Sequence, residues 1–261
     1  MYNFLINGHL NYGTSRELLC KTSLGCDSTS IRETVIVAPW WEPDRLANIE
    51  STLIKDGCIK VWDCTLFDKK FTFIKTGMGA SMCTDAILAL GTTNCKKLIF
   101  LGSSGALNSN MNIGDIAIPL FSICGDGVCR YLQKDITKDC FGEKYYPDDE
   151  FNNTLIDKTK KLCSDENVTY HLVNNFSIDT IFAEFAHLEH ILNLGCNSIE
   201  METAAVFKAS SLCNIPAVAI FSISDNTLQK KSLFNEINEE EHLYRKKIRK
   251  ELIPKIIYEI I

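Results

Sequence analysis

The sequence has few of the patterns that mark a metal or disulfide protein. It contains twelve cysteines but no Cys-x-x-Cys pair, and its one His-x-x-His, at His187 and His190, has no cysteine or third histidine nearby. Zinc sites are usually built from such closely spaced ligands. We therefore expect no metal site, and we expect reduced thiols that mostly lie buried as small apolar side chains.

Positive charge and long apolar runs are also scarce. The formal net charge is -6, so the chain as a whole is not attracted to nucleic acid or to anionic membranes. No stretch reaches the roughly 18 apolar residues that a membrane span needs, and the amino terminus has no basic segment ahead of an apolar run. We expect a cytoplasmic protein that binds neither nucleic acid nor a membrane.

No tandem repeat or Pro/Gly/Ser-rich linker divides the 261 residues, which predicts a single domain over 1–261 with an amino-terminal extension at 1–33. Apolar, β-favouring runs lie at Thr34–Ala38, Phe71–Lys75, Lys97–Gly102, Asp115–Phe121, Val168–Val173 and Pro216–Ser222. Helix-like segments lie near 43–56, 80–93, 151–165, 179–194, 201–213 and 236–260. This alternation predicts a mainly parallel or mixed sheet with helices on both faces.

Three of the predicted strands are followed by glycine-rich or polar segments: GMGAS (77–81), GSSGAL (102–107) and SISDNT (222–227). Ligands of α/β sheets bind at the carboxyl ends of the strands. The first segment lacks the third glycine and the later acid of a dinucleotide site, and the second is one residue short of the G-x-S-x-G of a serine hydrolase. Their glycines permit tight turns, and their N–H groups and hydroxyls can instead hold an anion or a sugar.

The segment SIEMETAAVF (198–207) places Glu200 and Glu202 around Met201, where an apolar strand gives way to a helix. Either glutamate can be a surface acid favoured by the helix dipole, and Asp225 of SISDNT can be an N-cap or turn residue. Together with the Gly/Ser segment, however, these groups can bind vicinal hydroxyls, an apolar ring face and a protonatable nitrogen. Those are the features of a nucleoside.

Five segments resemble, in order and spacing, the family of purine nucleoside phosphorylases and uridine phosphorylases, which also contains methylthioadenosine/S-adenosylhomocysteine nucleosidases and AMP nucleosidases. They are IKTGMGASMCTDAI (74–87), KKLIFLGSSGALNSNMNIGDIAI (96–118), NFSIDTIF (175–182), SIEMETAAVF (198–207) and AIFSISDNT (219–227). The resemblance implies a three-layer α/β/α sandwich with a mixed, partly barrel-like central sheet, assembled as a dimer, trimer or hexamer. It also implies a nucleoside and inorganic phosphate as substrates, with no cofactor.

The resemblance implies roles for the SIEMET residues. Glu202 matches the carboxylate that binds the ribose hydroxyls, and Met201 matches the side chain against the sugar face. Glu200 matches the acid before it and is expected to belong to the same ribose site. Cleavage of an N-glycosidic bond passes through a sugar with oxocarbenium character, so carboxylate contacts to the hydroxyls can strengthen as positive charge develops.

The base is expected to lie against three further residues. Asp225 matches the aspartate that protonates or hydrogen-bonds a departing purine at N7, and Ile181 and Phe182 match residues that line the base pocket. A general acid accelerates such a step by typically about 10²- to 10⁴-fold. Asp225 would need a raised pKa for this task, and burial beside an apolar strand would raise it. Asp225 therefore favours a purine.

The phosphate site is where the sequence departs from the family pattern. Family phosphorylases use a glycine and an arginine of a G-D-P-x-R loop, an arginine before the G-S-x-G turn, the hydroxyl of that turn and a neighbouring subunit's arginine. Arg45 and Ser103 match parts of this set, but Trp41 replaces the glycine and Phe100 replaces the second arginine. The glycine turn at Gly79 is a further candidate for holding the phosphate. No arginine occurs between 46 and 129 for the neighbour's contribution.

Two alternatives to phosphorolysis follow from these departures. In the nucleosidases that the sequence resembles, of the methylthioadenosine/S-adenosylhomocysteine or AMP type, a glutamate in the amino-terminal loop activates water for hydrolysis. Glu42 lies near that place, although it can equally cap the next helix or pair with Arg45. A non-catalytic nucleoside-binding protein is the second alternative. Arg130 in the segment 123–132 can approach the site or lie in a solvated loop, and the charged run 236–251 is expected to form a solvated helix face rather than a lid.

Overall fold

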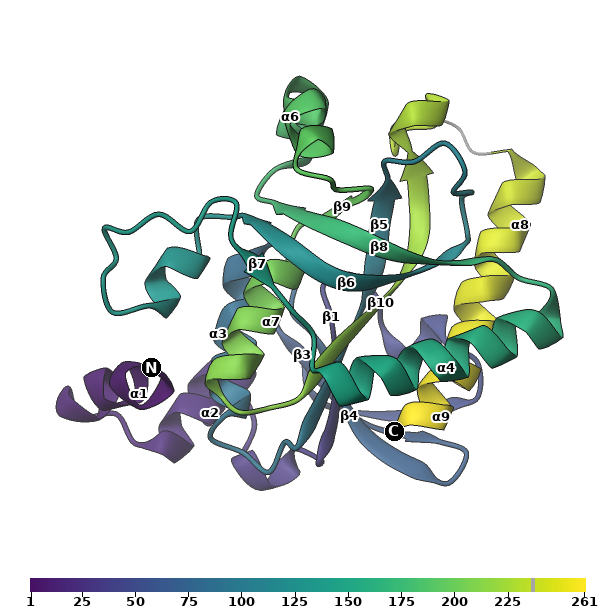
Figure 1. The fold of residues 1–261 in the computed structure, drawn as a ribbon. Helices are drawn as coiled ribbons and strands as arrows, with labels where there is room; N and C mark the ends of the chain where they lie inside the picture. The colour runs from purple at the N-terminus through teal and green to yellow at the C-terminus, as the bar shows by residue number, and fades with distance from the viewer. Residues whose placement is uncertain (236–237) are drawn as a thin grey trace.

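The fold is built on one mixed β-sheet, seen in a computed structural model that describes residues 1–235 and 238–261 (Figure 1). Its strands in that part of the chain are β1 (Thr34–Ala38), β2 (Ile49–Lys55), β3 (Lys60–Leu66), β4 (Lys69–Lys75), β5 (Lys97–Ala106), β6 (Ile116–Gly125), β7 (Lys144–Tyr145), β8 (Tyr170–Ile178), β9 (Ser198–Glu200) and β10 (Ala217–Asn226). The strand order is β10-β6-β8-β9-β5-β1-β4-β3-β2, with β7 beside β6. Because β10 also pairs with β5, the first five strands of this order close into a small barrel.

Helices cover both faces of the sheet. The α-helices of the described residues are α1 (Tyr2–Asn11), α2 (Arg16–Leu24), α3 (Ala80–Leu90), α4 (Asp149–Glu166), α5 (Ile181–Glu184), α6 (Leu188–Asn193), α7 (Thr203–Leu212), α8 (Glu239–Lys247) and α9 (Ile253–Ile260). Helices α3 and α7 pack together on one face, and α4 and α9 pack together on the other. This arrangement confirms the predicted three-layer sandwich with a partly barrel-like sheet. None of the helices in the described ranges has the length and apolar character needed to cross a bilayer.

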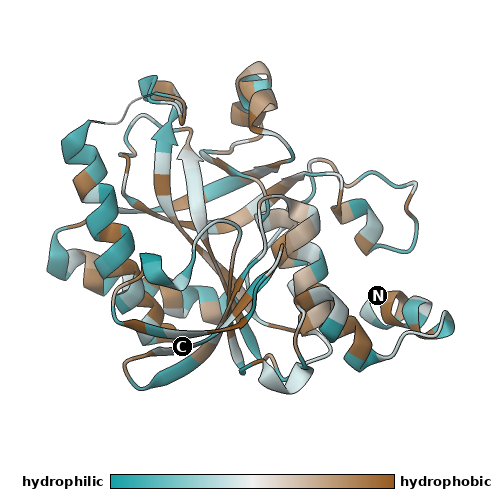
Figure 2. Ribbon diagram, turned by 180° about the vertical axis from the view of Figure 1, so that it is seen from behind, coloured by the Kyte–Doolittle hydropathy of each residue, from teal (hydrophilic) through white to brown (hydrophobic). Residues whose placement is uncertain are grey.

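The central strands bury side chains on both faces. In β1, Val35 and Val37 belong to the apolar cluster that includes α3 and α7, whereas Ile36 and Ala38 belong to the cluster that includes α4 and α9. Strands β5 and β10 alternate in the same way, because successive side chains of a strand point to opposite faces. The hydropathy colouring shows these apolar strands running between the helical layers (Figure 2). Two-sided burial is the reason the central strands are continuous apolar runs in the sequence.

All six predicted strands are present, but the helix predicted near 43–56 is wrong. A short 3-10 turn at Pro43–Arg45 is followed there by β2, which pairs antiparallel with the unpredicted strand β3. Most of β2 is exposed, so its sequence IESTLIK lacks the apolar run that marks the buried strands. Sequence periodicity therefore gave no strand signal for this hairpin.

The amino-terminal residues 1–33 add two helices that the sequence did not predict. Ser15 caps the start of α2, because its Oγ accepts a hydrogen bond from the Leu18 N–H at 3.1 Å. Gly25, with φ +70°, caps the end of the helix. The Tyr2 hydroxyl donates to the Leu88 carbonyl at 2.9 Å and joins α1 to α3. The extension therefore thickens the helical layer formed by α3 and α7.

The chain ends in one long helical run. Helix α8 continues through a π-helical segment, Ile248–Leu252, into α9, which confirms the predicted helix within the described residues. Glu236 and Ile237, the first residues of that prediction, lie outside the described ranges. The run packs closely over Gly114, where φ is +98° and a Cβ atom would lie 2.6 Å from Tyr244 Cδ1 and 3.0 Å from Arg245 Cα. Gly114 therefore sets how closely α8 approaches the sheet.

Replacing Gly114 by alanine is expected to lower the free energy of unfolding by about 2 kcal/mol or more. The left-handed backbone costs an L-residue about 1–2 kcal/mol, and the added methyl group overpacks the contact with α8. Urea unfolding measures the change. The matched control is Gly8→Ala inside α1, where no atom lies within 4 Å of the new methyl group and stability should be equal or higher. Equal stability of the Gly114 variant and the wild type would contradict the close approach of α8.

Candidate active site

The carboxyl ends of β5 and β10 hold two of the polar segments identified in the sequence. β5 continues to Ala106 and β10 to Asn226, so GSSGA and SISDN form the last residues of these strands. The sequence placed both segments just beyond the strands, which is corrected here. Strand geometry thus fixes these side chains more firmly than a loop would.

Strand pairing brings residues from three distant segments to one place. In the parallel pair β5–β10, Ser222 lies opposite Ser103 and Asp225 opposite Gly105. In the antiparallel pair β5–β9, Ile199 lies opposite the same Gly105. A Cβ atom on Gly105 would lie 3.1 Å from Ile199 Cγ2 and 3.2 Å from Asp225 Oδ2. The glycine therefore gives the Asp225 carboxylate space beside the strand that leads into SIEMET.

Glu200 is a buried anchor at the end of β9, with 7% of its surface exposed. Its Oε1 accepts hydrogen bonds from Asn175 Nδ2 at 2.7 Å and Ser177 Oγ at 2.6 Å. Its Oε2 accepts from the N–H groups of Glu202 at 2.7 Å and Thr203 at 2.8 Å. Burial raises the pKa of Glu200, and these bonds oppose that rise. Glu200 therefore caps the start of α7 from a buried position, not as a surface charge.

Glu202 makes no side-chain capping bond to α7, the helix that it precedes. It is 4% exposed, and the Gly79 N–H donates to its Oε1 at 2.6 Å. Gly79 has φ +105° and ends the GMG turn before α3, so the turn and the SIEMET segment meet at this bond. Burial, and then the nearby Glu200 charge, raise the pKa of Glu202 to about 8. Sequence reasoning proposed Gly79 and Glu202 for separate substrates and missed their contact.

Asp225 and a second acid, Glu184, lie buried near the end of β10. Asp225 is 3% exposed, and burial raises its pKa although the Ser224 hydroxyl, which donates to Oδ1 at 2.5 Å, and Arg245 oppose the rise. Glu184 accepts a hydrogen bond from Thr227 Oγ1 at 2.8 Å, and burial followed by the Asp225 charge raises its pKa. Sequence reasoning missed Glu184. Its only signal is an acid within the apolar stretch IFAEF.

Ile181 and Phe182, expected to line a base pocket, begin α5 directly after β8. Ile181 is half-buried and Phe182 is 84% exposed. The Phe182 ring lies 6.3 Å from the ring of Phe234, which is also exposed. Their role against a base stays a prediction, and Phe234 joins them as an aromatic neighbour that the sequence did not indicate.

A cationic cavity of about 330 Å³ lies beside the end of β5. It is lined by Trp40, Trp41, Asp44, Arg45, Ser103, His242, Arg245, Lys246, Arg249 and Lys250. The cavity unites Arg45 and Ser103, which the resemblance had placed at a phosphate site. The expectation of a solvated face for 236–251 is wrong for Arg245 and Arg249, which are half-buried and line this cavity. Their i, i+4 spacing was the available sequence signal.

Trp41 and Phe100, which replace expected phosphate residues, both lie in the apolar core. Trp41 is buried under the Arg249 guanidinium, which lies 5.6 Å from the ring centroid. Phe100 packs edge-on against Phe221 at 6.2 Å, within the cluster that includes α3 and α7. Both aromatic residues therefore serve packing at positions where the family pattern has phosphate contacts.

The Glu42 carboxylate forms ion pairs with two lysines. Lys75 Nζ donates to Glu42 Oε1 at 2.6 Å and Lys60 Nζ at 3.4 Å, and the Lys75 bond is the main cause of its lowered pKa. Among the described residues these two ion pairs stand in place of the alternative pair with Arg45, and Glu42 makes no side-chain capping bond to the 3-10 turn that follows it. A carboxylate with a lowered pKa is a weak base for activating water.

Arg130 lies away from the cationic cavity, at the surface of the segment 123–132. Its Nη2 forms an ion pair with Asp139 Oδ1 at 3.3 Å. Within one subunit Arg130 lies half-buried in the 3-10 turn Cys129–Leu132, and an approach to the site of a second subunit stays a prediction.

The cysteines of the described chain are all free, and nine of the twelve are buried, as expected. Cys124, Asp126 and Cys129 nevertheless place three possible metal ligands within 4.8 Å of one another. Here both thiols donate to Asp126, Cys124 to its carbonyl and Cys129 to its Oδ2, each at 3.4 Å. Metal binding requires thiolates, so this hydrogen bonding describes a thiol cluster. The absence of a metal stays a prediction.

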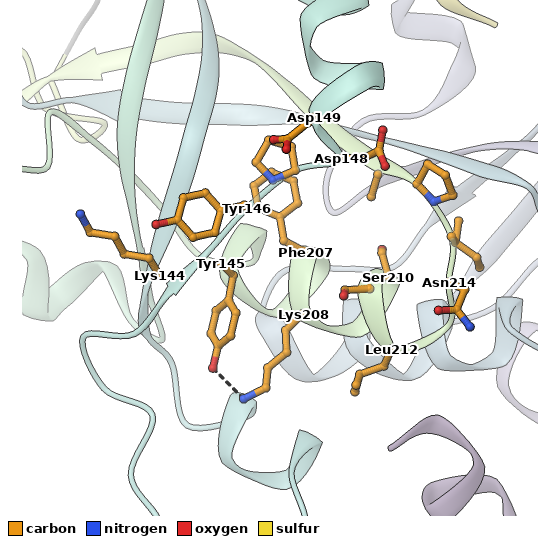
Figure 3. A pocket seen from close by; sticks show the side chains of 15 residues that line it. Lys144, Tyr145, Tyr146, Asp148, Asp149, Phe207, Lys208, Ser210, Leu212 and Asn214 are labelled. Carbon is orange, nitrogen blue, oxygen red and sulfur yellow. Dashed lines mark hydrogen bonds between the residues drawn. The ribbon is translucent and has the colours of Figure 1, made fainter.

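A second cavity, of about 930 Å³, lies at the other end of β10 (Figure 3). It extends from Ala217, the first residue of β10, to the start of α4 and the exposed side of α7, where Lys208 Nζ donates to the Tyr145 hydroxyl at 2.6 Å. Asp225 lies eight positions along β10 from Ala217, a distance of roughly 26 Å at the rise of a β-strand. This cavity therefore belongs to a different region from the carboxylates.

The chain belongs to the phosphorylase superfamily, whose family model matches residues 12–254. It is 25% identical over 164 residues to a DeoD-type purine nucleoside phosphorylase of Streptococcus thermophilus, covering 60% of this chain and 64% of that relative. The chain thus spans slightly less than two thirds of the relative's length.

Solved structures share the fold at lower identity. A uridine phosphorylase of Vibrio fischeri ES114 matches with a TM-score of 0.70 and 16% identity over 90% of this chain and 95% of its own. An AMP nucleosidase of Bacteroides thetaiotaomicron matches with a TM-score of 0.66 and 16% identity over 93% and 95%. These structures confirm the fold that the resemblance implied, and the family-model match confirms the family.

The raised pKa of Glu202 predicts how stability varies with pH. Between about pH 4.5 and 8 the unfolded chain has lost the Glu202 proton while the folded chain retains it, so the free energy of unfolding falls as pH rises. One proton contributes a slope of at most about 1.4 kcal/mol per pH unit. In Glu202→Gln this slope should be shallower, because Glu200 still titrates but residue 202 does not, and the variant should be more stable than the wild type at pH 8. Urea unfolding from pH 5 to 8 measures the free energy of unfolding of both proteins. An equal slope of this free energy with pH in the two proteins would contradict the burial of an ionisable Glu202.

Proposed function

We propose that the protein is a nucleoside phosphorylase, which cleaves the N-glycosidic bond of a purine nucleoside with phosphate and releases the free base and a pentose 1-phosphate. The observation that carries the proposal is the convergence of Asp225 and the Glu202 segment on Gly105 of β5. Membership of the phosphorylase superfamily supports it, as does similarity to proteins named as nucleoside phosphorylases.

Glu202 binds the ribose hydroxyls in this proposal, and Met201 packs against the sugar. The carboxyl group is held by the Gly79 N–H rather than by bulk water, so its position is fixed before the substrate arrives. Hydroxyl donors would stabilise the ionised form, which burial now disfavours. The carboxylate then faces a sugar that becomes positive in the transition state, where its charge contributes most.

Asp225 acts as the general acid. Burial raises its pKa, so it retains a proton at a higher pH than an exposed aspartate does. As a phosphate oxygen bonds to C1′, the C1′–N bond breaks, its electron pair goes to the base, and the Asp225 proton goes to N7. Glu184 adds a second acid near Asp225, held by Thr227, that can accept or donate a hydrogen bond to the base.

Phosphate is favoured over water as the nucleophile. Arg45 and Ser103 line a cavity rich in cations, which suits an anionic nucleophile. Hydrolysis would instead need a free base, and Glu42 is paired with Lys75 and Lys60. A non-catalytic binding protein would have no use for an acid with a raised pKa beside the base.

The remaining expectations stay predictions. We place the protein in the cytoplasm, as a homo-oligomer in nucleoside salvage that requires no cofactor besides its co-substrate phosphate.

Incubation with purine, pyrimidine and methylthio-nucleosides, with and without phosphate, tests the function. Free base measured by chromatography should appear for purine nucleosides only when phosphate is present. Glu202→Gln should lower kcat at least about 100-fold, because the ionised carboxylate acts on the developing positive charge. Its matched control is Glu50→Gln on the exposed strand β2, which should retain wild-type rates.

Since Glu202→Gln should be at least as stable as the wild type at pH 8, misfolding cannot account for its lost turnover. Wild-type kinetics in this variant would exclude the ribose role. Base release that ignores phosphate would identify a nucleosidase instead.

Asp225→Asn should slow cleavage of an ordinary purine nucleoside by about 10²- to 10⁴-fold, the usual contribution of a general acid. The loss should be far smaller for an N7-methylated purine nucleoside, whose cationic base leaves without accepting a proton. Steady-state rates on the two substrates measure the difference. Equal losses on both would show that Asp225 acts through structure rather than by proton donation.

A further inference from the structure

Three arginines from the two ends of the chain line one cavity. Arg45 comes from the 3-10 turn after β1, and Arg245 and Arg249 come from the carboxyl-terminal helical run. Within residues 1–235 and 238–261, none of the three forms an ion pair with an acid within 4.0 Å. The Arg245 Nε is buried and has no hydrogen-bond partner among those same residues.

Such a cluster is unfavourable without a bound anion. Burial, then repulsion from Arg245 and Arg45, lower the pKa of Arg249 to about 10. Burial also lowers the pKa of Arg245, although the Asp225 charge opposes this. Partly buried like charges cost stability, and they gather mainly where a ligand of opposite charge is bound.

The helical run holds its arginines rigidly toward the cavity. Residues 242, 245, 246, 249 and 250 recur at helical spacing and all line it. On the opposite side, the Tyr244 hydroxyl donates to Asp115 Oδ1 at 3.2 Å and Ile248 is buried in the core. The Ala47 N–H donates to the Lys250 carbonyl at 2.8 Å, which ties the run to the segment that follows Arg45. The cationic face is therefore positioned before any ligand binds.

The chemistry of the lining identifies the anion. Guanidinium groups donate paired, charge-assisted hydrogen bonds that match phosphate oxygens, and Ser103 adds a hydroxyl. A volume of about 330 Å³ is at the lower end of the usual range for small-molecule sites, which is enough for a phosphate group and part of a sugar. Ser103 lies on β5 two residues before Gly105, where Asp225 lies alongside, so the anion would sit near the reacting bond.

We propose that Arg245 and Arg249 of the carboxyl-terminal helix, with Arg45 and Ser103, bind the phosphate dianion that attacks C1′. This assignment rests on the proposed phosphorylase function. The two helix arginines replace the contacts that are missing at Trp41 and Phe100. They keep their protons throughout and hold the phosphate oxygens while one oxygen bonds to C1′ and the base departs with the electron pair of the broken bond.

Titration calorimetry with inorganic phosphate and the full chain tests the site without turnover. Arg245→Gln and Arg249→Gln should each weaken phosphate binding by about 10- to 100-fold, the effect of losing one hydrogen bond to a charged group. Lys247→Gln is the matched control, because it removes a positive charge from the same helix on the side facing Glu166. Its phosphate affinity should equal that of the wild type.

Kinetics should show the same selectivity. The KM for phosphate should rise by a similar factor in Arg245→Gln and Arg249→Gln, while the KM for the nucleoside changes little. Unfolding curves without phosphate should lie at or above the wild type, since each substitution removes a repelling charge. Wild-type phosphate affinity in both arginine variants would overturn the proposal, and so would an equal loss in Lys247→Gln.

A nucleoside 5′-monophosphate separates the two sources of a phosphate group. If this nucleotide, without inorganic phosphate, binds more tightly than its nucleoside and loses that advantage in the arginine variants, the site holds a substrate phosphate and the co-substrate assignment is overturned. Glu202→Gln separates this test from that of the function, because it should bind inorganic phosphate normally while losing turnover. If the wild type binds phosphate but cleaves no nucleoside, the anion site stands and the proposed reaction fails.

Discussion

The geometry of the candidate site depends on one buried carboxylate, that of Glu200. It accepts hydrogen bonds from two side chains of β8, Asn175 and Ser177, and from two backbone N–H groups at the start of α7. Without the Glu200 carboxylate, each of these four buried donors would lose a hydrogen-bond acceptor. A buried polar group left without a partner costs about 1–3 kcal/mol. The same bonds fix the turn that carries Met201 and aim Glu202 at the Gly79 turn. The hydrogen bonds that Glu200 accepts from the protein therefore determine where the proposed ribose carboxylate of Glu202 lies.

Burial displaces ionisable groups of both signs from their ordinary pKa values around this centre. The pKa values of Glu202 and Asp225 are raised, and those of Arg245 and Arg249 are lowered. Asp225 and Arg245 oppose each other's shifts, so the acidic and cationic halves are electrostatically linked. Substrate hydroxyls and phosphate oxygens would offset the unfavourable burial of each half. Such a strained arrangement in the free protein is the expected consequence of building a site for ligands rather than for stability.

The parts of this picture that the sequence predicted are those with a local signal. Central strands are apolar on both faces and stand out as runs, whereas β2 is solvent-exposed and its residues have no such pattern. Glu202 and Asp225 were found because their motifs are short and contiguous. Arg245 and Arg249 were missed because EEEHLYRKKIRKE has the composition of a solvated helix. Only the packing of the last helix over the sheet distinguishes the cavity-lining Arg245 and Arg249 from Lys247, which faces Glu166.

That packing also explains how the proposed phosphate site can form without the residues that the family pattern places there. Phe100 points into the α3/α7 layer, whereas Ser103 opens toward the helical run that packs with α4. The run brings Arg245 and Arg249 to the cavity that Ser103 also lines, and the core position is left to the aromatic side chain of Phe100. The close approach of α8 to Gly114 makes this arrangement possible. In the proposed reaction the barrel strands would position the nucleoside, and the carboxyl-terminal helical run would help to position the phosphate. The strands must be apolar to be buried on both faces, whereas the run can carry many charged residues.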